Sequence, residues 1–364
     1  MANKNLNAAK TAKKDEFYTQ MTDIERELQH YWPHFRDKVV LCNCDDPYES
    51  NFFKYFALRF NQLGLKKLIC TCFDGSPVQG NELLLDFGDF TDDPKKIAYK
   101  VEITEVKDLN GDGAVDLADV QYLLKNDKNA ISLLKQHGDF RSTECIELLK
   151  QADIVVTNPP FSLFREYIGQ LMQYEKKFLI IGNINVVTYK EVFPLIKENK
   201  VWLGPSITSG DRKFNVPDDY PLNASGCGLD SDGKRFIRVK GVRWFTNLDH
   251  NKRHEELDLV CRYSLDEYPI YDNYNAINVG RTQDIPCDYV EAMGVPITFL
   301  DKYNPEQFEI IWQACGNTRA SAPADILKEL CYTPHPEDRG GCGVINGERQ
   351  YARVIIRNKH PKKL

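Results

Sequence analysis

The chain lacks any run of 18 apolar residues, and its first 14 residues, MANKNLNAAKTAKK, contain no apolar stretch. The first absence argues against a transmembrane helix, and the second argues against a secretory signal. The 11 cysteines are odd in number and do not have the spacing of a small disulfide-stapled domain, which indicates reduced thiols. We therefore predict a soluble cytoplasmic protein in which residues 1–14 form a flexible basic arm.

The chain also lacks a net positive charge, since the formal net charge of the 364 residues is -6. A negative balance argues against nucleic-acid binding, which depends largely on neutralising phosphates. The acidic excess is local, however: residues 74–119 contain 12 acidic and 4 basic residues, so the rest of the chain has a net charge of +2. Lys and Arg are dense from Arg212 to Arg253 and at both termini, which allows a basic face elsewhere.

The β-branched run at residues 154–157 ends abruptly in Asn158-Pro159-Pro160-Phe161. The run predicts a buried strand of a parallel sheet, and the prolines end it because they lack backbone N–H groups. The tetrapeptide then lies at the carboxyl edge of the sheet, where open α/β sheets bind ligands. The Asn158 side chain and the Pro159 carbonyl can accept the two N–H hydrogens of an aromatic amine such as adenine N6, and Phe161 can stack on the base. The alternative is a plain proline turn after a core strand.

Apolar strands alternate with helices between residues 38 and 205, which predicts a doubly wound α/β sheet. Two further predicted strands end in acidic residues. Asp45 and Asp46 follow one strand and suit the ammonium group of a methionine moiety, whereas Asp74 follows the next and suits ribose hydroxyls.

Three stretches together resemble the EcoRI-type adenine-specific DNA methyltransferases: DEFYT at residues 15–19, VVLCNCDDPYESNFFKYF at residues 39–56, and NPPF. The resemblance implies a Rossmann-like sheet that binds S-adenosylmethionine and transfers its methyl group to N6 of an adenine flipped out of double-stranded DNA. It also makes a cognate restriction endonuclease a candidate partner. Many amino-methyltransferases that use S-adenosylmethionine have a Gly-x-Gly turn after the first strand, which lets the cofactor approach the backbone, whereas this chain has Ser50 and Phe52 in place of the glycines.

Two further groups of residues are candidates for cofactor contacts. Phe17, Tyr18 and Thr19 precede a predicted helix, where backbone donors and an aromatic can meet the charged end of a ligand. Alternatively, the two aromatics only anchor that helix to the core. In the family, a carboxylate and an aromatic before the catalytic motif hold the adenine of S-adenosylmethionine, and Asp139 and Phe140 match this pair.

From about residue 205 the composition shifts to Gly, Pro, Asn and Asp, with aromatic residues interleaved with cations. Hydrophobic and cationic residues alternate over residues 236–245, which predicts a strand with one basic face. The family carries its target recognition after the catalytic motif, so we expect phosphate contacts here; a solvated charged strand is the alternative. The predicted DNA-binding residues are Arg212, Lys213, Arg238, Lys240 and Arg243.

Residues 108–119 have the spacing of an EF-hand-like or dockerin-like calcium loop. Oxygen ligands stand at the six expected loop positions, and Gly113 stands where the loop turns sharply. We predict one structural Ca²⁺, with an acidic capped turn at the start of the next helix as the alternative. The predicted ligands are Asp108, Asn110, Asp112, the carbonyl of Ala114, Asp116 and Asp119.

Cys42, Cys44, Cys70 and Cys72 alternate along two strands that should be neighbours. A four-thiolate zinc site is one interpretation. The spacing differs from the Cys-x-x-Cys knuckles of structural zinc sites, so four small core residues are the favoured interpretation.

We predict four segments: the arm at 1–14, an S-adenosylmethionine-binding catalytic domain at 15–204 with the calcium-loop insertion at 106–127, a target-recognition region that also completes the sheet at 205–312, and a C-terminal extension at 313–364. The predicted function is site-specific DNA N6-adenine methylation. The alternatives are methylation of RNA or of protein glutamine, and a catalytically silent DNA-binding module.

Overall fold

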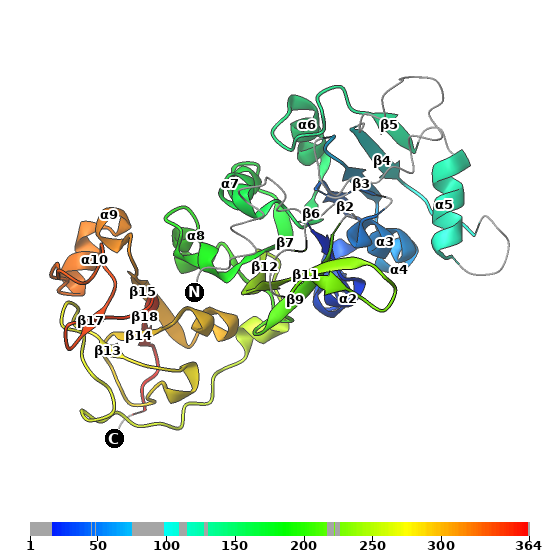
Figure 1. The fold of residues 1–364 in the computed structure, drawn as a ribbon. Coiled ribbons are helices and arrows are strands. Elements are labelled where there is room, and N and C mark those ends of the chain that lie inside the picture. The colour runs from blue at the N-terminus through cyan, green and yellow to red at the C-terminus, as the bar shows by residue number, and fades with distance from the viewer. Residues whose placement is uncertain are drawn as a thin grey trace. The chain divides into compact units, whose positions relative to one another are not determined.

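The computed structural model describes residues 17–44, 46–47, 49–74, 98–108, 115–126, 130–216, 222 and 226–362. The chain forms two compact units (Figure 1). The first comprises Met1–Asn183 and Ser209–Leu248, and the second comprises Ile184–Thr208 and Asp249–Leu364. These limits differ from the boundaries predicted at residues 204 and 312, because residues 209–248 of the predicted target-recognition region belong to the first unit and residues 249–312 to the second.

The first unit is built around a large mixed sheet of α/β type (Figure 1). The strands of this unit follow one another in the sheet as β5 (Ile131–Leu133), β4 (Tyr99–Ile103), β3 (Lys67–Thr71), β2 (Val39–Cys42), β6 (Ile154–Thr157), β7 (Lys177–Asn183) and β12 (Val242–Thr246). The four strands β3, β2, β6 and β7 are parallel, and β4, β5 and β12 pair antiparallel at the two sides.

The order of the parallel strands determines where a ligand can bind. β2 lies between β3 and β6 in the sheet. β3 is therefore added on one side of β2 and β6 on the other, which makes the end of β2 a topological switch point. Both β2 and β6 are buried along their whole length, as their apolar sequences predict. Open α/β sheets bind ligands at the carboxyl ends of strands at such a switch point, and NPPF follows β6 at this end.

Helices connect the strands of the first unit, and three of them have side-chain caps. Ser50 caps α3, Asp116 caps α5, and Ser142 caps α6. α2 begins after Gln20 without a side-chain cap. The helices are α2 (Met21–Leu28), α3 (Asn51–Leu58), α4 (Phe60–Leu63), α5 (Leu117–Asn126), α6 (Thr143–Gln151) and α7 (Phe164–Gln173), with the 3-10 helices η1 (Trp32–Phe35) and η3 (Phe161–Leu163).

A second, antiparallel sheet in the first unit contains β1 (Tyr18–Thr19), β9 (Asp211–Asn215), β11 (Arg235–Lys240) and β10 (Gly228–Leu229), in that order. The single basic strand predicted over residues 236–245 is therefore two strands, β11 here and β12 in the large sheet. The chain turns between them at Gly241, whose φ of 71° is readily adopted only by glycine.

The second unit has its own four-stranded sheet, in the order β13 (Ile277–Asn278), β14 (Met293–Pro296), β18 (Arg353–Asn358) and β15 (Phe308–Ala314). The region 205–312, which was predicted to complete the catalytic sheet, joins that sheet through β12, whereas β14 and β15 pair with the C-terminal strand β18. The other elements are α8 (Phe193–Lys197), β8 (Trp202–Leu203), α9 (Thr318–Ser321), α10 (Ala324–Glu329), the hairpin β16 (Val344–Ile345) with β17 (Glu348–Arg349), and the 3-10 helices η4 (Ile184–Thr188), η5 (Asn251–His254), η6 (Thr282–Asp284) and η7 (Ile297–Lys302).

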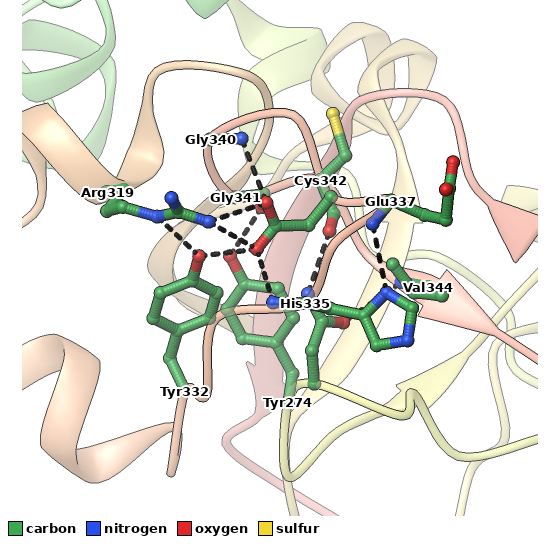
Figure 2. Close-up of polar contacts among 11 residues, drawn as sticks. Tyr274, Arg319, Tyr332, His335, Glu337, Gly340, Gly341, Cys342 and Val344 are labelled. Atoms are coloured by element: carbon green, nitrogen blue, oxygen red, sulfur yellow. Dashed lines mark hydrogen bonds and ion pairs between the residues drawn. The ribbon is translucent and has the colours of Figure 1, made fainter. Parts of the chain in front are cut away.

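Asp338 is a buried carboxylate of the second unit, and its partners Tyr332, Arg319, His335 and Gly340 lie close together (Figure 2). It accepts hydrogen bonds from the Tyr332 hydroxyl at 2.6 Å, from Arg319 Nη2 at 2.7 Å, and from the main-chain N–H groups of Gly340 at 2.9 Å and His335 at 3.1 Å. Burial opposes ionisation, but these donors outweigh it and lower the pKa of Asp338 to about 2. Asp338 is therefore an ionised carboxylate with partners on both oxygens.

None of the helices in the described stretches has the length and apolarity needed to cross a membrane.

Candidate active site

The NPPF tetrapeptide begins immediately after β6. Asn158 is 2% exposed, and Pro159 and Pro160 are also buried. Phe161 begins η3, which leads directly into α7. The strand ends where the two prolines predict, and its last residues are held between β2 and β7.

The Asn158 amide has one paired atom and one unpaired atom. Its Nδ2 donates a hydrogen bond to the main-chain carbonyl of Phe17 at 2.7 Å. Its Oδ1 is buried and has no hydrogen-bond partner among the described residues. Since only the NH₂ group can donate to a carbonyl, this contact determines the orientation of the amide. A buried, unpaired carbonyl oxygen is thus present at the position predicted to accept the substrate amine.

Phe17 connects the N-terminal segment to the tetrapeptide. Its ring is 1% exposed and meets Phe161 edge to face, with ring centroids 6.0 Å apart and planes at 88°. It also packs at 5.8 Å against Phe214 of β9. Tyr18 and Thr19 follow in β1, paired with β9. The predicted group Phe17, Tyr18 and Thr19 is therefore placed beside the catalytic motif, with the Phe17 ring packed into the core.

The departure from the family's glycine turn has a clear structural role. Ser50 Oγ accepts from the main-chain N–H groups of Phe52 at 3.2 Å and Phe53 at 3.4 Å, so it caps α3. Between them, Asn51 Nδ2 donates to the carbonyl of Thr19 at 2.7 Å. Ser50 thus supplies a helix cap where a glycine was expected, and its neighbour Asn51 supplies a bond to β1.

Two predicted cofactor carboxylates lie after neighbouring strands. Asp46, after β2, is 3% exposed and accepts from the Tyr99 hydroxyl at 2.6 Å. Asp74, after β3, contacts His137 Nδ1 at 2.5 Å. Gly138 brings this loop against the end of β3: its φ is 73°, and a Cβ there would lie 2.0 Å from the Cys72 carbonyl oxygen. Asp45 lies outside the described residues.

Asp139 and Phe140 occupy the same edge but differ in their contacts. The Asp139 carboxylate is held by the Arg141 guanidinium, at 2.9 Å for Nε and 2.7 Å for Nη2. This bidentate partner holds the pKa of Asp139 below its usual range. Phe140 is buried and packs edge to face on Tyr167, with centroids 5.1 Å apart.

Asn43 is a candidate that the sequence analysis missed. It follows β2, is 6% exposed, and its Oδ1 accepts a short hydrogen bond from the Tyr167 hydroxyl. Burial raises the pKa of Tyr167 well above its usual value, so the hydroxyl stays protonated and donates. Asn43 Nδ2 is left as a donor at the carboxyl end of β2. The sequence did contain a signal for Asn43, because a polar residue there interrupts the apolar run of a predicted strand.

Three of the other buried polar atoms without partners in the described part of the chain belong to residues close in sequence to Asn158 or Phe17. They are Thr157 Oγ1 beside Asn158, and Thr19 Oγ1 and Gln20 Nε2 just after Phe17. Native proteins leave few buried polar groups unpaired, so several at one place favour a ligand that pairs with them.

The predicted DNA-binding cations have two different locations. Lys213 of β9 and Arg238 of β11 are direct cross-strand partners and share one face of the small sheet, with Phe236 below both. Arg212 and Lys240 lie on the same two strands. Arg243, in contrast, is 3% exposed in β12, and its Nη1 donates to the Val242 carbonyl at 2.8 Å. Arg243 is therefore not on the basic surface that its alternating sequence predicted.

The predicted metal sites are not assembled in the described residues, among which no three His, Cys, Asp or Glu side chains are grouped to hold a metal ion. Asp116 Oδ1 accepts from the N–H of Ala118 at 2.7 Å, and Asp119 Oδ2 accepts from the N–H of Asp116 at 2.9 Å. These contacts form the capped turn that was the alternative to a calcium loop. Of the other predicted ligands, Asp108 is half-buried, and Asn110, Asp112 and Ala114 lie outside the described residues.

The four alternating cysteines support the core interpretation. Cys42 and Cys70 are register partners on β2 and β3, and both are buried. Cys44 and Cys72 are also buried, and their thiols donate to Asn43 Oδ1 at 3.7 Å and to the Tyr99 carbonyl at 3.7 Å, respectively.

Comparison with known proteins shows the family to which the chain is similar. A family model described as adenine-specific methyltransferase EcoRI matches residues 5–359. The chain is 48% identical over 363 residues to the type II methyltransferase M.EcoRI of Escherichia coli, which covers 99% of the chain and 98% of that relative. It is 38% identical to M.MpnI of Mycoplasma pneumoniae and 37% identical to M.MgeORF184P of Mycoplasma genitalium, both type II methyltransferases, over 97% of the chain and 98% of each relative. No solved structure matches the chain.

Proposed function

This chain belongs to the EcoRI family of adenine-specific methyltransferases, as its sequence motifs predicted, and we propose that it methylates N6 of a flipped-out adenine in a specific sequence of double-stranded DNA. The methyl donor in this proposal is S-adenosylmethionine. The single observation that carries the proposal is the unpaired, buried Oδ1 of Asn158, held in place by the bond from Nδ2 to Phe17.

The chemistry of the target explains why this oxygen matters. The lone pair of adenine N6 is delocalised into the ring, so the amine is a poor nucleophile. Acceptors for both N–H hydrogens, Asn158 Oδ1 and the Pro159 carbonyl, favour a pyramidal nitrogen that can attack. The new N–C bond forms as the C–S bond of the sulfonium donor breaks, and the extra proton on nitrogen can then leave to solvent. Orientation of the amine toward the methyl carbon contributes the remaining acceleration.

The residues at the carboxyl ends of β2 and β3 fit the proposed cofactor. Carboxylates at Asp46 and Asp74 suit an ammonium group and ribose hydroxyls, and the free Asn43 Nδ2 suits a carboxylate. S-Adenosylmethionine carries all three groups on one molecule and supplies the electrophilic methyl.

The small antiparallel sheet supports the proposed DNA contact. Lys213 and Arg238 are adjacent on one face, and Lys240 is exposed at the end of β11. Their acidic neighbours, Asp230 at 2.9 Å from Lys213 and Asp211 at 3.8 Å from Arg238, would be replaced as partners by phosphates. We place the reaction in the cytoplasm, alongside an endonuclease that reads the same sequence, as the type II names of the relatives suggest.

The test is long-read sequencing of plasmid DNA from cells expressing the wild type or Asn158→Ala. We expect N6-methyladenine at one sequence motif with the wild type and none with the variant. Unmodified DNA from the folded wild type would contradict the proposal. Transfer of labelled methyl to RNA or protein would then support those substrates, and failure to bind S-adenosylmethionine would indicate a silent binding module.

The calcium loop at residues 108–119 is a separate proposal, supported by its ligand spacing. If it binds Ca²⁺, excess calcium raises the melting temperature relative to chelator, since a ligand of the native state stabilises it. Asp116→Asn should abolish that difference. Equal melting temperatures for the wild type under both conditions would leave only the capped turn.

A further inference from the structure

The main chain of Phe17 determines which atom of the Asn158 amide is left unpaired. A carbonyl oxygen can only accept, so it holds the NH₂ group and leaves Oδ1 unpaired. A rotated amide would place Oδ1 at 2.7 Å from another oxygen, which is repulsive. The position of residue 17 thus determines whether the proposed acceptor is presented.

The segment that carries this carbonyl is short. β1 contains only Tyr18 and Thr19, and its ladder with β9 consists of the pairs Tyr18–Asn215 and Thr19–Phe214. Two residues of pairing at the edge of a sheet hold a strand weakly. Besides the Phe17 ring, which packs on Phe161 and Phe214, one side-chain attachment adds to this ladder and helps to keep the Phe17 carbonyl on Asn158.

Asn51 provides that attachment. Its Nδ2 donates to the carbonyl of Thr19 at 2.7 Å, two residues from Phe17. Asn51 is the first residue of α3, and the Ser50 cap just before it fixes the start of that helix. α3 itself is well anchored, since Phe52, Phe53 and Phe56 are each no more than 2% exposed. The side chain of Asn51 thus connects a helix anchored in the core to β1, two residues after the carbonyl that holds Asn158.

We propose that Asn51 is a positioning residue for methyl transfer. By holding Thr19 it keeps the Phe17 carbonyl on Asn158 Nδ2, and so keeps Oδ1 directed to the substrate amine. The inference rests on the proposed role of Asn158 and adds a residue that does not touch the reactants.

Two substitutions and one control test this role. Asn51→Ala removes the bond, and Asn51→Asp keeps the shape of the side chain but replaces the donor with an acceptor. An acidic residue in the first turn of a helix is favourable, so Asn51→Asp should not destabilise α3. The matched control is Asn61→Ala, because Asn61 Nδ2 makes the same kind of bond, at 2.9 Å to the Val106 carbonyl, in the same unit.

The measurements are single-turnover methylation of duplex DNA at saturating cofactor, equilibrium binding of DNA and S-adenosylmethionine, and melting temperature. We expect both Asn51 variants to react about tenfold more slowly, because small misplacements of reacting groups reduce rates by this order. Binding of both ligands should stay within about twofold. Asn61→Ala should show a loss of melting temperature similar to that of Asn51→Ala and keep the wild-type rate.

Normal single-turnover rates for both Asn51 variants would overturn the inference, and so would an equal slowing by Asn61→Ala. A loss of rate explained entirely by weaker cofactor binding would also overturn it, because β1 would then be a binding element. Asn158→Ala distinguishes a failure of the role of Asn51 from a failure of the role of Asn158. If Asn158→Ala reacts slowly while the Asn51 variants do not, only the inference about Asn51 fails. If Asn158→Ala reacts normally, the proposed role of Asn158 fails as well.

Discussion

Asn158 in the first unit and Asp338 in the second are both polar, both almost fully buried, and opposite in how their oxygens are used. Asp338 is 1% exposed, and its two oxygens accept from Tyr332, Arg319 and two main-chain N–H groups. Asn158 is 2% exposed, and its Oδ1 accepts from no described residue. A fully paired carboxylate organises loops, whereas a buried acceptor without a partner costs stability unless a ligand supplies the donor. The difference distinguishes a structural centre from a site.

One unpaired atom alone does not identify a site. Trp312 Nε1 in β15 is also buried and unpaired within the described chain, yet no other unpaired group adjoins it in sequence. Around Asn158, by contrast, Thr157, Thr19 and Gln20 also have unpaired atoms, and the Asn158–Phe17 bond brings their two segments together. The site is recognised by this grouping together with the NPPF chemistry.

The largest effect should come from removing the unpaired acceptor. Asn158→Ala should raise the barrier to methyl transfer by about 3 kcal/mol, a loss of about 100-fold in single-turnover rate, because it removes one preorganised partner of the reacting nitrogen. The melting temperature should change little, since only one hydrogen bond is lost. A variant that keeps a near-normal rate would show that Oδ1 is not the acceptor.

The converse result is expected for the paired carboxylate. Asp338→Ala should lower the free energy of unfolding by about 2 to 3 kcal/mol, because it leaves buried main-chain and tyrosine donors without an acceptor. Chemical denaturation measures this loss, and the methylation rate of the folded variant should match the wild type. Glu337→Ala, at an exposed position in the same loop, is the control and should be nearly neutral. Equal stabilities for the two variants would contradict the structural role.

The same carboxylate should make stability depend on pH at the acid end. The pKa of Asp338 is lowered to about 2 in the folded state, against about 3.9 in an unfolded chain. Its contribution is therefore fully present above pH of about 4 and is lost as the pH falls toward about 2. Asp338→Asn removes this component, so the difference in unfolding free energy between wild type and variant should shrink over that interval. A constant difference would mean that ionisation of Asp338 does not stabilise the fold.

The smallest effect should come from two threonines of the large sheet. Thr246 Oγ1 donates to the Phe178 carbonyl at 2.7 Å and accepts from the Leu248 N–H at 3.0 Å, whereas Thr157 Oγ1 is unpaired. Thr246→Val should therefore cost about 1 kcal/mol of stability, and Thr157→Val should change stability by less than about 0.5 kcal/mol. If Thr157 contributes to the site, its variant should instead bind S-adenosylmethionine or DNA more weakly. Equal destabilisation by both substitutions would show that Thr157 is paired in solution.

Several features of this protein could be predicted because they depend on neighbours in sequence. The apolar run before Asn158 forms β6, and the two prolines end it, since both effects act within a few residues. Asp46 and Asp74 follow strands whose periodicity is local, so their place at one edge of the sheet was predictable. The family resemblance was predicted from contiguous stretches of matching sequence, and it is confirmed by a relative that covers nearly the whole chain.

Other features could not be predicted, because a local pattern fits more than one arrangement. Alternation of cations from 236 to 245 fits a single strand, but the turn at Gly241 sends β11 and β12 to different sheets and buries Arg243. The capped turn at Asp116 and Asp119 uses the same residues that a calcium loop would use. The spacing of these residues does not show whether their carboxylates bind a calcium ion or the neighbouring main-chain N–H groups.

The sequence by itself determined the family of the chain and the Asn-Pro-Pro-Phe turn after a buried strand. Only the tertiary structure decided which atom of the Asn158 amide is paired and which is left without a described partner. That choice depends on the Phe17 carbonyl, 141 residues away, and on Asn51, which holds the strand that carries it. Local steric rules end a strand, but a hydrogen bond between distant segments exists only once the fold has brought them together.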